Sequence, residues 1–150
     1  MPLNAAAAVL KWVDVGSEMH SRELALRYRI LRAPLGLPPG SEVHASEDII
    51  WHLVAVQETQ VVGCVLLLPD AEQRTGQLLQ MAVDPSLQGQ GMGRKLVLCL
   101  EERAAQEGFS SIVLHARQVA SVFYRKLGYV PQGDYFEEVG IPHQVMIKDF

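Results

Sequence analysis

Apolar and polar residues follow two patterns along the chain: in some stretches they alternate, and in others apolar residues recur every three or four positions. The first pattern is typical of strands and the second of helices. Helices are predicted at Glu18–Arg32, Met92–Gln106 and Gln118–Leu127. Strands are predicted at Val9–Val15, on both sides of a turn within Ile49–Asp70, at Thr75–Val83, at Ser111–His115, and on both sides of Gly140 in the tail.

Turn and end signals support these boundaries. Glu58-Thr59-Gln60 separates two apolar runs, as in a hairpin. Ser17 is a candidate N-cap, Gly108 is placed to end the second helix, and "APLGLPPGSE" at 33–42 is a Pro/Gly loop. The order strand, helix, three strands, helix, strand, helix, two strands predicts a single α/β (α+β) domain over residues 1–150, in which helices pack on a mixed sheet.

Composition suits one compact domain and excludes several classes of protein. The chain has 150 residues, of which 49% are hydrophobic, and a net charge of −4 argues against a nucleic-acid-binding surface. The longest apolar run, Val61–Leu68, is too short to cross a bilayer, and no charged leader opens the chain, so a cytoplasmic protein without membrane contact is expected. Cys64 and Cys99 lie in apolar patterns typical of buried, reduced thiols. No set of metal-ligand spacings is present, so no metal is predicted.

A glycine-rich turn, Gln88-Gly89-Gln90-Gly91-Met92-Gly93, lies between a predicted strand and a predicted helix. Glycine admits positive φ and lets a ligand approach the backbone amides. The first N–H groups of a helix have no internal partner, so the turn is a candidate site for an anion such as pyrophosphate. Its G-x-G-x-G spacing is not that of dinucleotide-binding turns, and no G-K-[ST] follows as in a Walker P-loop. A plain strand-to-helix turn would also explain these glycines.

Residues 81–129 resemble the GCN5-related N-acetyltransferase (GNAT) family in two motifs. The pattern [RQ]-x-x-G-x-[GA] after a strand falls on Gln88, Gly91 and Gly93, and "ASVFYRKLGY" at 120–129 matches A-x-x-F-Y-x-x-x-G-[FY]. The two motifs occur in the family's order and at its separation. The resemblance implies a mostly antiparallel central sheet flanked by helices, with acetyl-CoA as co-substrate.

By this resemblance, coenzyme A contacts are expected along one strand, the following turn and the helix start. The residues concerned are Met81, Ala82 and Val83 for the pantetheine arm and the thioester, through their backbone, then Gln88, Gly89, Gln90, Gly91, Met92 and Gly93 for the pyrophosphate, and Arg94 or Lys95 for an outer phosphate. Arg117 stands seven positions before Tyr124, where many family members carry an asparagine that contacts the cofactor. An arginine there could reach a phosphate instead.

Tyr124 is the predicted general acid, and by the resemblance it also contacts the cofactor. When an amine attacks the acetyl thioester, the leaving thiolate needs a proton, and the ordinary pKa values of a thiol and a tyrosine, about 8.5 and about 10, allow that transfer. Ala120 and Tyr124 share one face of the predicted helix, opposite Val119, Val122 and Phe123, so Tyr124 is expected to face a ligand. The alternative is a core tyrosine with a satisfied hydroxyl.

The acceptor side rests on fewer signals. The segment Tyr135–Met146 contains G-I-P-H and resembles the ElaA-like branch of the family. His143 is a candidate general base or substrate contact, because a histidine can accept a proton near neutral pH. Its alternation with Val145 and Ile147 fits a packed strand residue equally well.

Further polar residues are candidates for the same role. Glu137 and Glu138 could take a proton through water or bind a cationic amine, or could simply be solvated. His115 ends its predicted strand beside the expected cleft. Arg22 and Arg29 lie seven positions apart on one helix face and could bind an acidic acceptor, although a solvated face explains them equally well.

The sequence therefore predicts an N-acetyltransferase that moves an acetyl group from acetyl-CoA to a primary amine of a small molecule or peptide, by direct attack in a ternary complex. A non-catalytic acyl-CoA-binding or regulatory module is an alternative on the same fold. An interaction domain with a purely structural glycine turn is another. The acceptor and the oligomeric state stay open, with a homodimer as one option.

Overall fold

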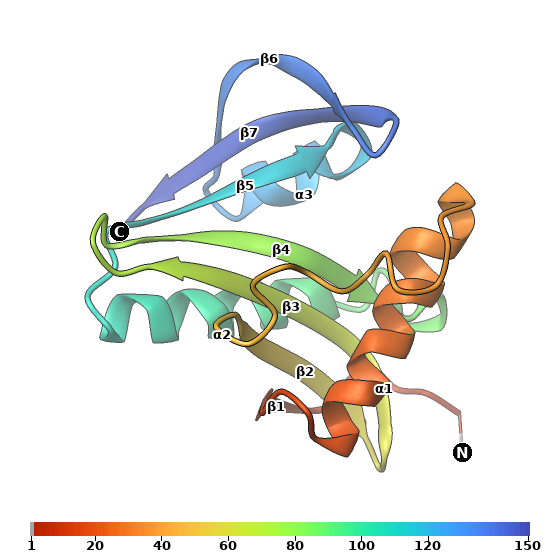
Figure 1. Cartoon of the computed structure of the whole chain (residues 1–150). Helices are drawn as coiled ribbons and strands as arrows, with labels where there is room; N and C mark the ends of the chain where they lie inside the picture. The colour runs from red at the N-terminus through yellow and green to blue at the C-terminus, as the bar shows by residue number, and fades with distance from the viewer. Residues whose placement is uncertain (1) are drawn as a thin grey trace.

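The computed structural model describes residues 2–150 and contains a seven-stranded sheet with the strand order β1-β2-β3-β4-β5-β7-β6 (Figure 1). The strands are β1 Val9–Val13, β2 Trp51–Gln57, β3 Gln60–Asp70, β4 Thr75–Val83, β5 Ser111–Arg117, β6 Val130–Glu138 and β7 Ile141–Asp149. The α-helices are α1 Glu18–Arg27, α2 Met92–Gln106 and α3 Ser121–Lys126. The short helical segments are η1 Ala5–Ala7, η2 Tyr28–Arg32, η3 Ala33–Leu35, η4 Pro85–Leu87 and η5 Gln118–Ala120. Neighbouring strands are antiparallel except β4 and β5, which confirms the predicted mixed, mostly antiparallel sheet.

Helices cover both faces of the sheet. Along β3, Val65 and Leu67 pack into a cluster with residues of α2, whereas Cys64 and Leu66 pack into a second cluster with residues of α1. Successive strand residues point to opposite faces, so α1 and α2 lie on opposite sides of the sheet (Figure 1). Burial on both faces explains the continuous apolar run Val61–Leu68.

Strand β4 pairs with β5 over a short distance and then diverges from it. Thr75–Leu78 is in register with Ser111–Leu114, and beyond this point the two strands separate (Figure 1). On its other side, the register of β4 against β3 shifts at Gln80 and Met81, two residues that lie opposite Val65, and Gln80 has φ +42°. Such a bulge bends a strand. The bulge therefore accompanies the opening of the sheet between β4 and β5.

Several predicted elements are confirmed with their boundaries, and others end differently. Both β4 and α2 have the predicted bounds. The predicted helix Glu18–Arg32 is helical throughout, but α1 ends at Arg27 and η2 continues as a π-helix. Pro34 follows, and because proline lacks an N–H and restricts the preceding residue, the chain passes into the short η3. The predicted helix Gln118–Leu127 begins with η5, a 3₁₀ turn, before α3.

The predicted N-cap of the first helix is confirmed, and the predicted burial of the two cysteines is confirmed for one of them. Ser17 caps α1, since its Oγ accepts the amide hydrogen of His20 at 3.2 Å. Cys64 is buried, Cys99 is only half-buried, and both are free thiols. Across residues 2–150, no helix has the length and apolar character needed to cross a membrane.

Candidate functional site

A cavity of about 1000 Å³ opens where β4 and β5 diverge. It is lined by the end of η2, the second half of β4, the start of α2, the end of β5, α3 and the β6–β7 connection. Segments that are far apart in the sequence therefore meet at one opening in the sheet. Most of the residues singled out by the sequence lie around it.

The glycine-rich turn forms one wall of this cavity. Gly89 and Gly91 have φ of +79° and +83°, and Gly91 is the N-cap of α2 without a side-chain cap. The first amides of α2 are therefore open to an anionic ligand. Gly93 serves packing as well, because a Cβ there would lie 3.2 Å from Cζ of Phe123 on α3.

The predicted turn residues do not all reach the cavity. Gln88, Gly89, Gly91, Met92, Gly93 and Arg94 line it. Gln90 and Lys95 are not among its lining residues. The Gln90 side chain instead donates to the carbonyl of Ser86 at 3.1 Å and accepts from the amide of Ala5 at 3.4 Å.

Strand β4 contributes backbone to the cavity. Met81, Ala82 and Val83 all line it, while their side chains pack against the two core clusters, as expected. Because β4 and β5 pair only as far as Leu78, the edge of Met81–Val83 that faces β5 has no strand partner. Peptide groups on this edge are available to hydrogen-bond an extended ligand.

Tyr124 lies on α3 with 6% of its surface exposed, and it both packs in the core and lines the cavity. Its ring makes edge contacts with Phe123 and Tyr129. Burial raises the pKa of Tyr124, and the charge of Arg117 opposes that rise. The phenol therefore keeps its proton at neutral pH.

The expected helix face around Tyr124 is wrong in one respect. Val119 and Val122 are 93% and 63% exposed, so they form no buried stripe opposite Tyr124. The reason is that α3 is short and lies against the sheet through Ser121, Tyr124 and Leu127, which leaves the valines in solvent.

Three residues from β5, β6 and β7 meet at the opposite wall. His115 Nδ1 lies 3.0 Å from Glu138 Oε1, and His143 Nε2 lies 3.6 Å from Glu138 Oε2. His143 is buried, and its Nδ1 is 2.9 Å from the carbonyl of Ile141, which can only accept. Nδ1 therefore carries the proton, and in the neutral ring Nε2 keeps its lone pair. All three side chains line the cavity.

Of the two adjacent carboxylates, the structure brings Glu138 to the cavity and not Glu137. Successive side chains of a strand point to opposite sides, so only one of the pair can face His115 and His143. Glu137 is exposed and is not among the residues that line the cavity, so the structure does not place it where the sequence analysis expected it, and its neighbour Glu138 lies there instead.

The two arginines that the sequence suggested for an acidic acceptor lie away from the cavity. Arg22 pairs with Glu18 at 2.6 Å and with the carbonyl of Thr59, and Arg29 pairs with Asp84 at 3.2 Å. Neither lines the cavity, whereas Arg32 and Arg117 do. The π-helical geometry of η2 breaks the regular α spacing on which the Arg22–Arg29 expectation rested.

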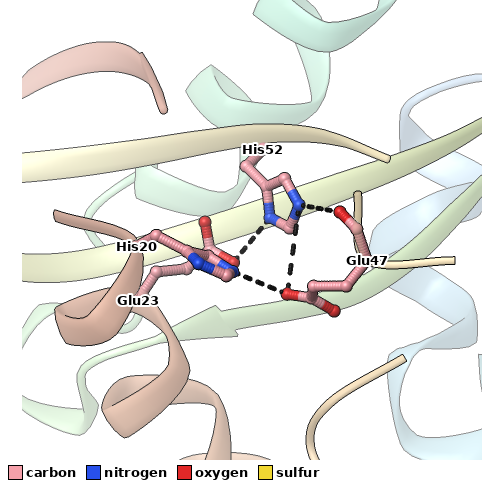
Figure 2. Close-up of side chains that lie close together, drawn as sticks. All are labelled: His20, Glu23, Glu47 and His52. Carbon is pink, nitrogen blue, oxygen red and sulfur yellow. Dashed lines mark hydrogen bonds and ion pairs between the residues drawn. The ribbon is translucent and has the colours of Figure 1, made fainter. Parts of the chain in front are cut away.

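A buried ionic network joins α1, β2 and the segment between them (Figure 2). His20 Nδ1 accepts the amide of Gly16 at 3.1 Å, so its Nε2 carries the proton and donates to Glu47 at 2.8 Å. His52 lies 2.7 Å from Glu23 through Nδ1 and 3.0 Å from the carbonyl of Glu47 through Nε2. Two such acceptors favour an imidazolium that donates from both nitrogens.

Arg27, which is fully buried, completes the network. It donates to Glu23 at 2.8 Å and to the two oxygens of Glu47 at 2.5 and 3.1 Å. Burial by itself would raise the pKa of Glu47, but hydrogen bonds from Arg27 and His20 lower it to about 2. Burial would likewise lower the pKa of His52, but the hydrogen bond to Glu23 and its charge raise it.

The four side chains of Figure 2 are of types that bind metal ions, and their ligand atoms lie within 4.8 Å of one another. Apart from Glu23 Oε1, however, their nitrogens and carboxylate oxygens already have hydrogen-bond partners. Arg27 and a charged His52 balance the two carboxylates. A divalent cation would have to displace the guanidinium, so the cluster fits an internal ion network better than a metal centre.

The network also reaches the cavity wall. Arg27 Nε donates to Gln80 Oε1 at 2.8 Å, and Gln80 Nε2 donates to the carbonyl of Glu42 at 3.0 Å. Gln80 is the bulged residue of β4, so the network holds the strand where it bends. Sequence reasoning missed this arrangement, although the spacing of His20, Glu23 and Arg27 along one helix face was a signal.

A sheet opened between two parallel strands, with a bare helix N-terminus at the opening, defines the fold of the acyl-CoA N-acyltransferases. The chain belongs to the GNAT family: the family model described as acetyltransferase (GNAT) domain matches residues 42–150.

One relative supports this assignment, and two solved structures share the fold. The Bacillus subtilis protein YyaT is 33% identical over 108 residues, which cover 72% of each chain. The structure of Escherichia coli ElaA matches with a TM-score of 0.78 at 18% identity, over 95% of this chain and 99% of that one. An aminoglycoside 6′-N-acetyltransferase complexed with coenzyme A matches with a TM-score of 0.77 at 19% identity, over 94% of this chain and 96% of that one.

Proposed function

We propose that the protein is an acetyl-CoA-dependent N-acetyltransferase that acts on a primary amine of a small molecule or peptide. One observation carries the proposal: the bare start of α2, the free edge of β4, Tyr124 and His143 all line one cavity. The first two suit a diphosphate joined to an extended arm, and the last two suit proton transfer at the far end of that arm.

Coenzyme binding is assigned to backbone groups. Within the turn, the amides of Gln88 and Gln90 already donate to the carbonyls of Pro85 and Leu87, so the pyrophosphate is held by the amides of Gly89, Gly91, Met92 and Gly93. Arg94 lies beside an outer phosphate. The edge of Met81–Val83 that faces away from β3 pairs with the pantetheine arm and polarises the thioester carbonyl. The protein's net charge of −4 does not oppose this, since the charge near the turn comes from helix amides.

His143 and Tyr124 move the protons. The amine nitrogen attacks the thioester carbon, its proton passes to His143 Nε2, and Glu138 stabilises the imidazolium that forms. The carbon–sulfur bond then breaks, and Tyr124 donates its hydroxyl proton to the leaving sulfur. The cavity removes water from the thiolate as well as from the phenol, so the pKa values of both groups rise together. The products are the acetylated amine and free coenzyme A.

The test is release of free thiol from acetyl-CoA in the presence of an amine panel. Tyr124→Phe is expected to lower kcat by about 10²-fold or more, because proton donation to the sulfur is lost. Tyr135→Phe is the matched control, since Tyr135 lies on β6, is 47% exposed and does not line the cavity.

The outcomes separate the competing functions. If Tyr124→Phe releases thiol as fast as the unsubstituted protein, the acid assignment fails. If the protein binds coenzyme A but acetylates no amine, it is the non-catalytic acyl-CoA-binding module that the fold also allows.

A further inference from the structure

Among the described residues, three arginines line the cavity without an ion-pair partner: Arg94 at the start of α2, and the two that share a carbonyl contact, Arg32 and Arg117. Arg32 donates to the carbonyls of Ser41 at 3.3 Å and Leu31 at 3.4 Å, and Arg117 donates to the same Leu31 carbonyl at 3.5 Å. Within residues 2–150, no carboxylate lies within 4.0 Å of the guanidinium nitrogens of Arg32 or Arg117. Both are partly buried.

Holding these two cations together is unfavourable unless something compensates. Burial lowers the pKa of Arg32, and the positive charge of Arg117 lowers it further. The charges of Glu138 and Glu42 act in the opposite direction, but neither carboxylate reaches Arg32, and Glu138 faces His115 and His143. In a protein with 17 acidic residues, carboxylates were available, so a site without one points to an anion that is supplied from outside.

The position of the pair identifies which ligand supplies that anion. Arg117 lies across from His143 in the β5–β7 register, and its charge acts on Tyr124. Arg32 is carried by η2, and its Ser41 contact draws the loop before β2 against the cavity. The pair therefore stands with the proton-transfer residues at the reacting end, whereas the pyrophosphate turn lies at the start of α2.

We propose that the acceptor amine carries an oxyanion, a carboxylate or a phosphonate or phosphate group, and that Arg32 and Arg117 bind it. Guanidinium groups match the paired oxygens of such groups, and binding them places the amine toward His143. His44 lines the same cavity, and because its Nδ1 accepts the amide of Ser46 at 2.9 Å, its Nε2 has a proton to donate to the same anion. This inference rests on the proposed acetyl transfer and narrows its acceptor to amino acids and aminoalkyl phosphonates or phosphates.

The test pairs each anionic acceptor with a neutral counterpart: amino acids with their amides, and aminoalkylphosphonates with the matching alkylamines. Thiol release from acetyl-CoA should show a kcat/KM at least about 10-fold higher for the anionic member of a pair. Arg32→Gln and Arg117→Gln should each raise KM for the anionic member by about 10- to 100-fold and change it little for the neutral one. Arg32→Lys should raise this KM less than Arg32→Gln does, because lysine keeps the positive charge but lacks the planar guanidinium that can bind two oxygens at once.

Arg125→Gln is the control for charge, because Arg125 lies on α3, is exposed and does not line the cavity. A second readout needs no turnover: inorganic phosphate, titrated into protein saturated with coenzyme A, should bind the unsubstituted protein and the Arg125 variant. It should not bind the Arg32 and Arg117 variants.

Two results would overturn the inference. One is an unchanged preference among acceptors together with unchanged phosphate binding in both variants. The other is a loss of coenzyme A affinity in the variants without a change in acceptor KM, which would assign the arginines to the coenzyme's phosphates. If no amine is acetylated at all, the proposed function fails, and phosphate binding alone then decides whether the two arginines form an oxyanion site.

Discussion

Replacing Glu47 by glutamine tests how much the buried ion network contributes to the free energy of unfolding, and at which pH that contribution is lost. Glu47 contacts Arg27 through both oxygens and His20 through one, and its pKa falls from 4.5 to about 2 in the folded state. A carboxyl group whose pKa is lowered by folding stabilises the protein above its unfolded pKa, and the contribution disappears as pH falls toward the folded value. The window for Glu47 therefore lies between pH 4.5 and about 2.

The magnitude follows from the same two pKa values. At pH 7 the contribution is about 3.4 kcal/mol, and at pH 3.5 about 2 kcal/mol of it remains. Glutamine resembles the protonated carboxyl group, so Glu47→Gln should cost about 3 kcal/mol at pH 7. That agrees with the usual cost of about 3–5 kcal/mol for removing one partner of a buried ion pair. The difference in unfolding free energy between the two proteins should therefore shrink by about 1.4 kcal/mol from pH 7 to pH 3.5.

Urea unfolding followed by tryptophan fluorescence measures this difference. Trp12 and Trp51 both pack on the guanidinium of Arg103, so their emission reports loss of tertiary structure. Glu18→Gln is the control, because the Glu18 side chain is 80% exposed and its pair with Arg22 is worth only about 0.5 kcal/mol. The reasoning is refuted if the loss of unfolding free energy caused by Glu47→Gln stays constant with pH. It is also refuted if that loss never exceeds the loss caused by Glu18→Gln.

Four other substitutions test the structure in different places. Gly91→Ala and Gly108→Ala should each cost about 1–2 kcal/mol in unfolding free energy, because both positions have φ near +83°, but calorimetric titration should show weaker coenzyme A binding for Gly91→Ala alone. Tyr129→Phe should cost about 1–2 kcal/mol by urea unfolding, since it removes the 2.8 Å hydrogen bond to the buried Glu101, and a neutral result would show that this bond is not formed. His143→Gln should lower kcat by about 10²-fold while the Kd of coenzyme A stays unchanged, and an equal loss in both would make it a binding residue rather than the base.

Local sequence patterns were enough to predict most of the segments proposed to bind the coenzyme. The strand Thr75–Val83, the glycine turn and the helix Met92–Gln106 are adjacent in the sequence, and their boundaries follow from periodicity and glycine placement. Since the proposed coenzyme contacts there involve backbone groups, knowing the elements was nearly enough to predict that these segments line the cavity. Tyr124 was placed by its motif, although the valines beside it proved to be exposed.

The acceptor side depended on distances that no local pattern contains. Whether Glu137 or Glu138 faces the cavity depends on the register of β6 against β7. Whether Arg29 or Arg32 faces it depends on the π-helix η2, which the sequence did not predict. The network around Arg27 joins residues separated by up to 53 positions.

The sequence by itself determined the order of the elements, the bare helix start and the family to which the chain belongs, because these depend on neighbours a few residues apart. The tertiary structure alone decided which charged side chains meet. A buried ion pair or an unpaired arginine exists only once distant segments pack and exclude water, and its energy depends on that exclusion rather than on spacing along the chain.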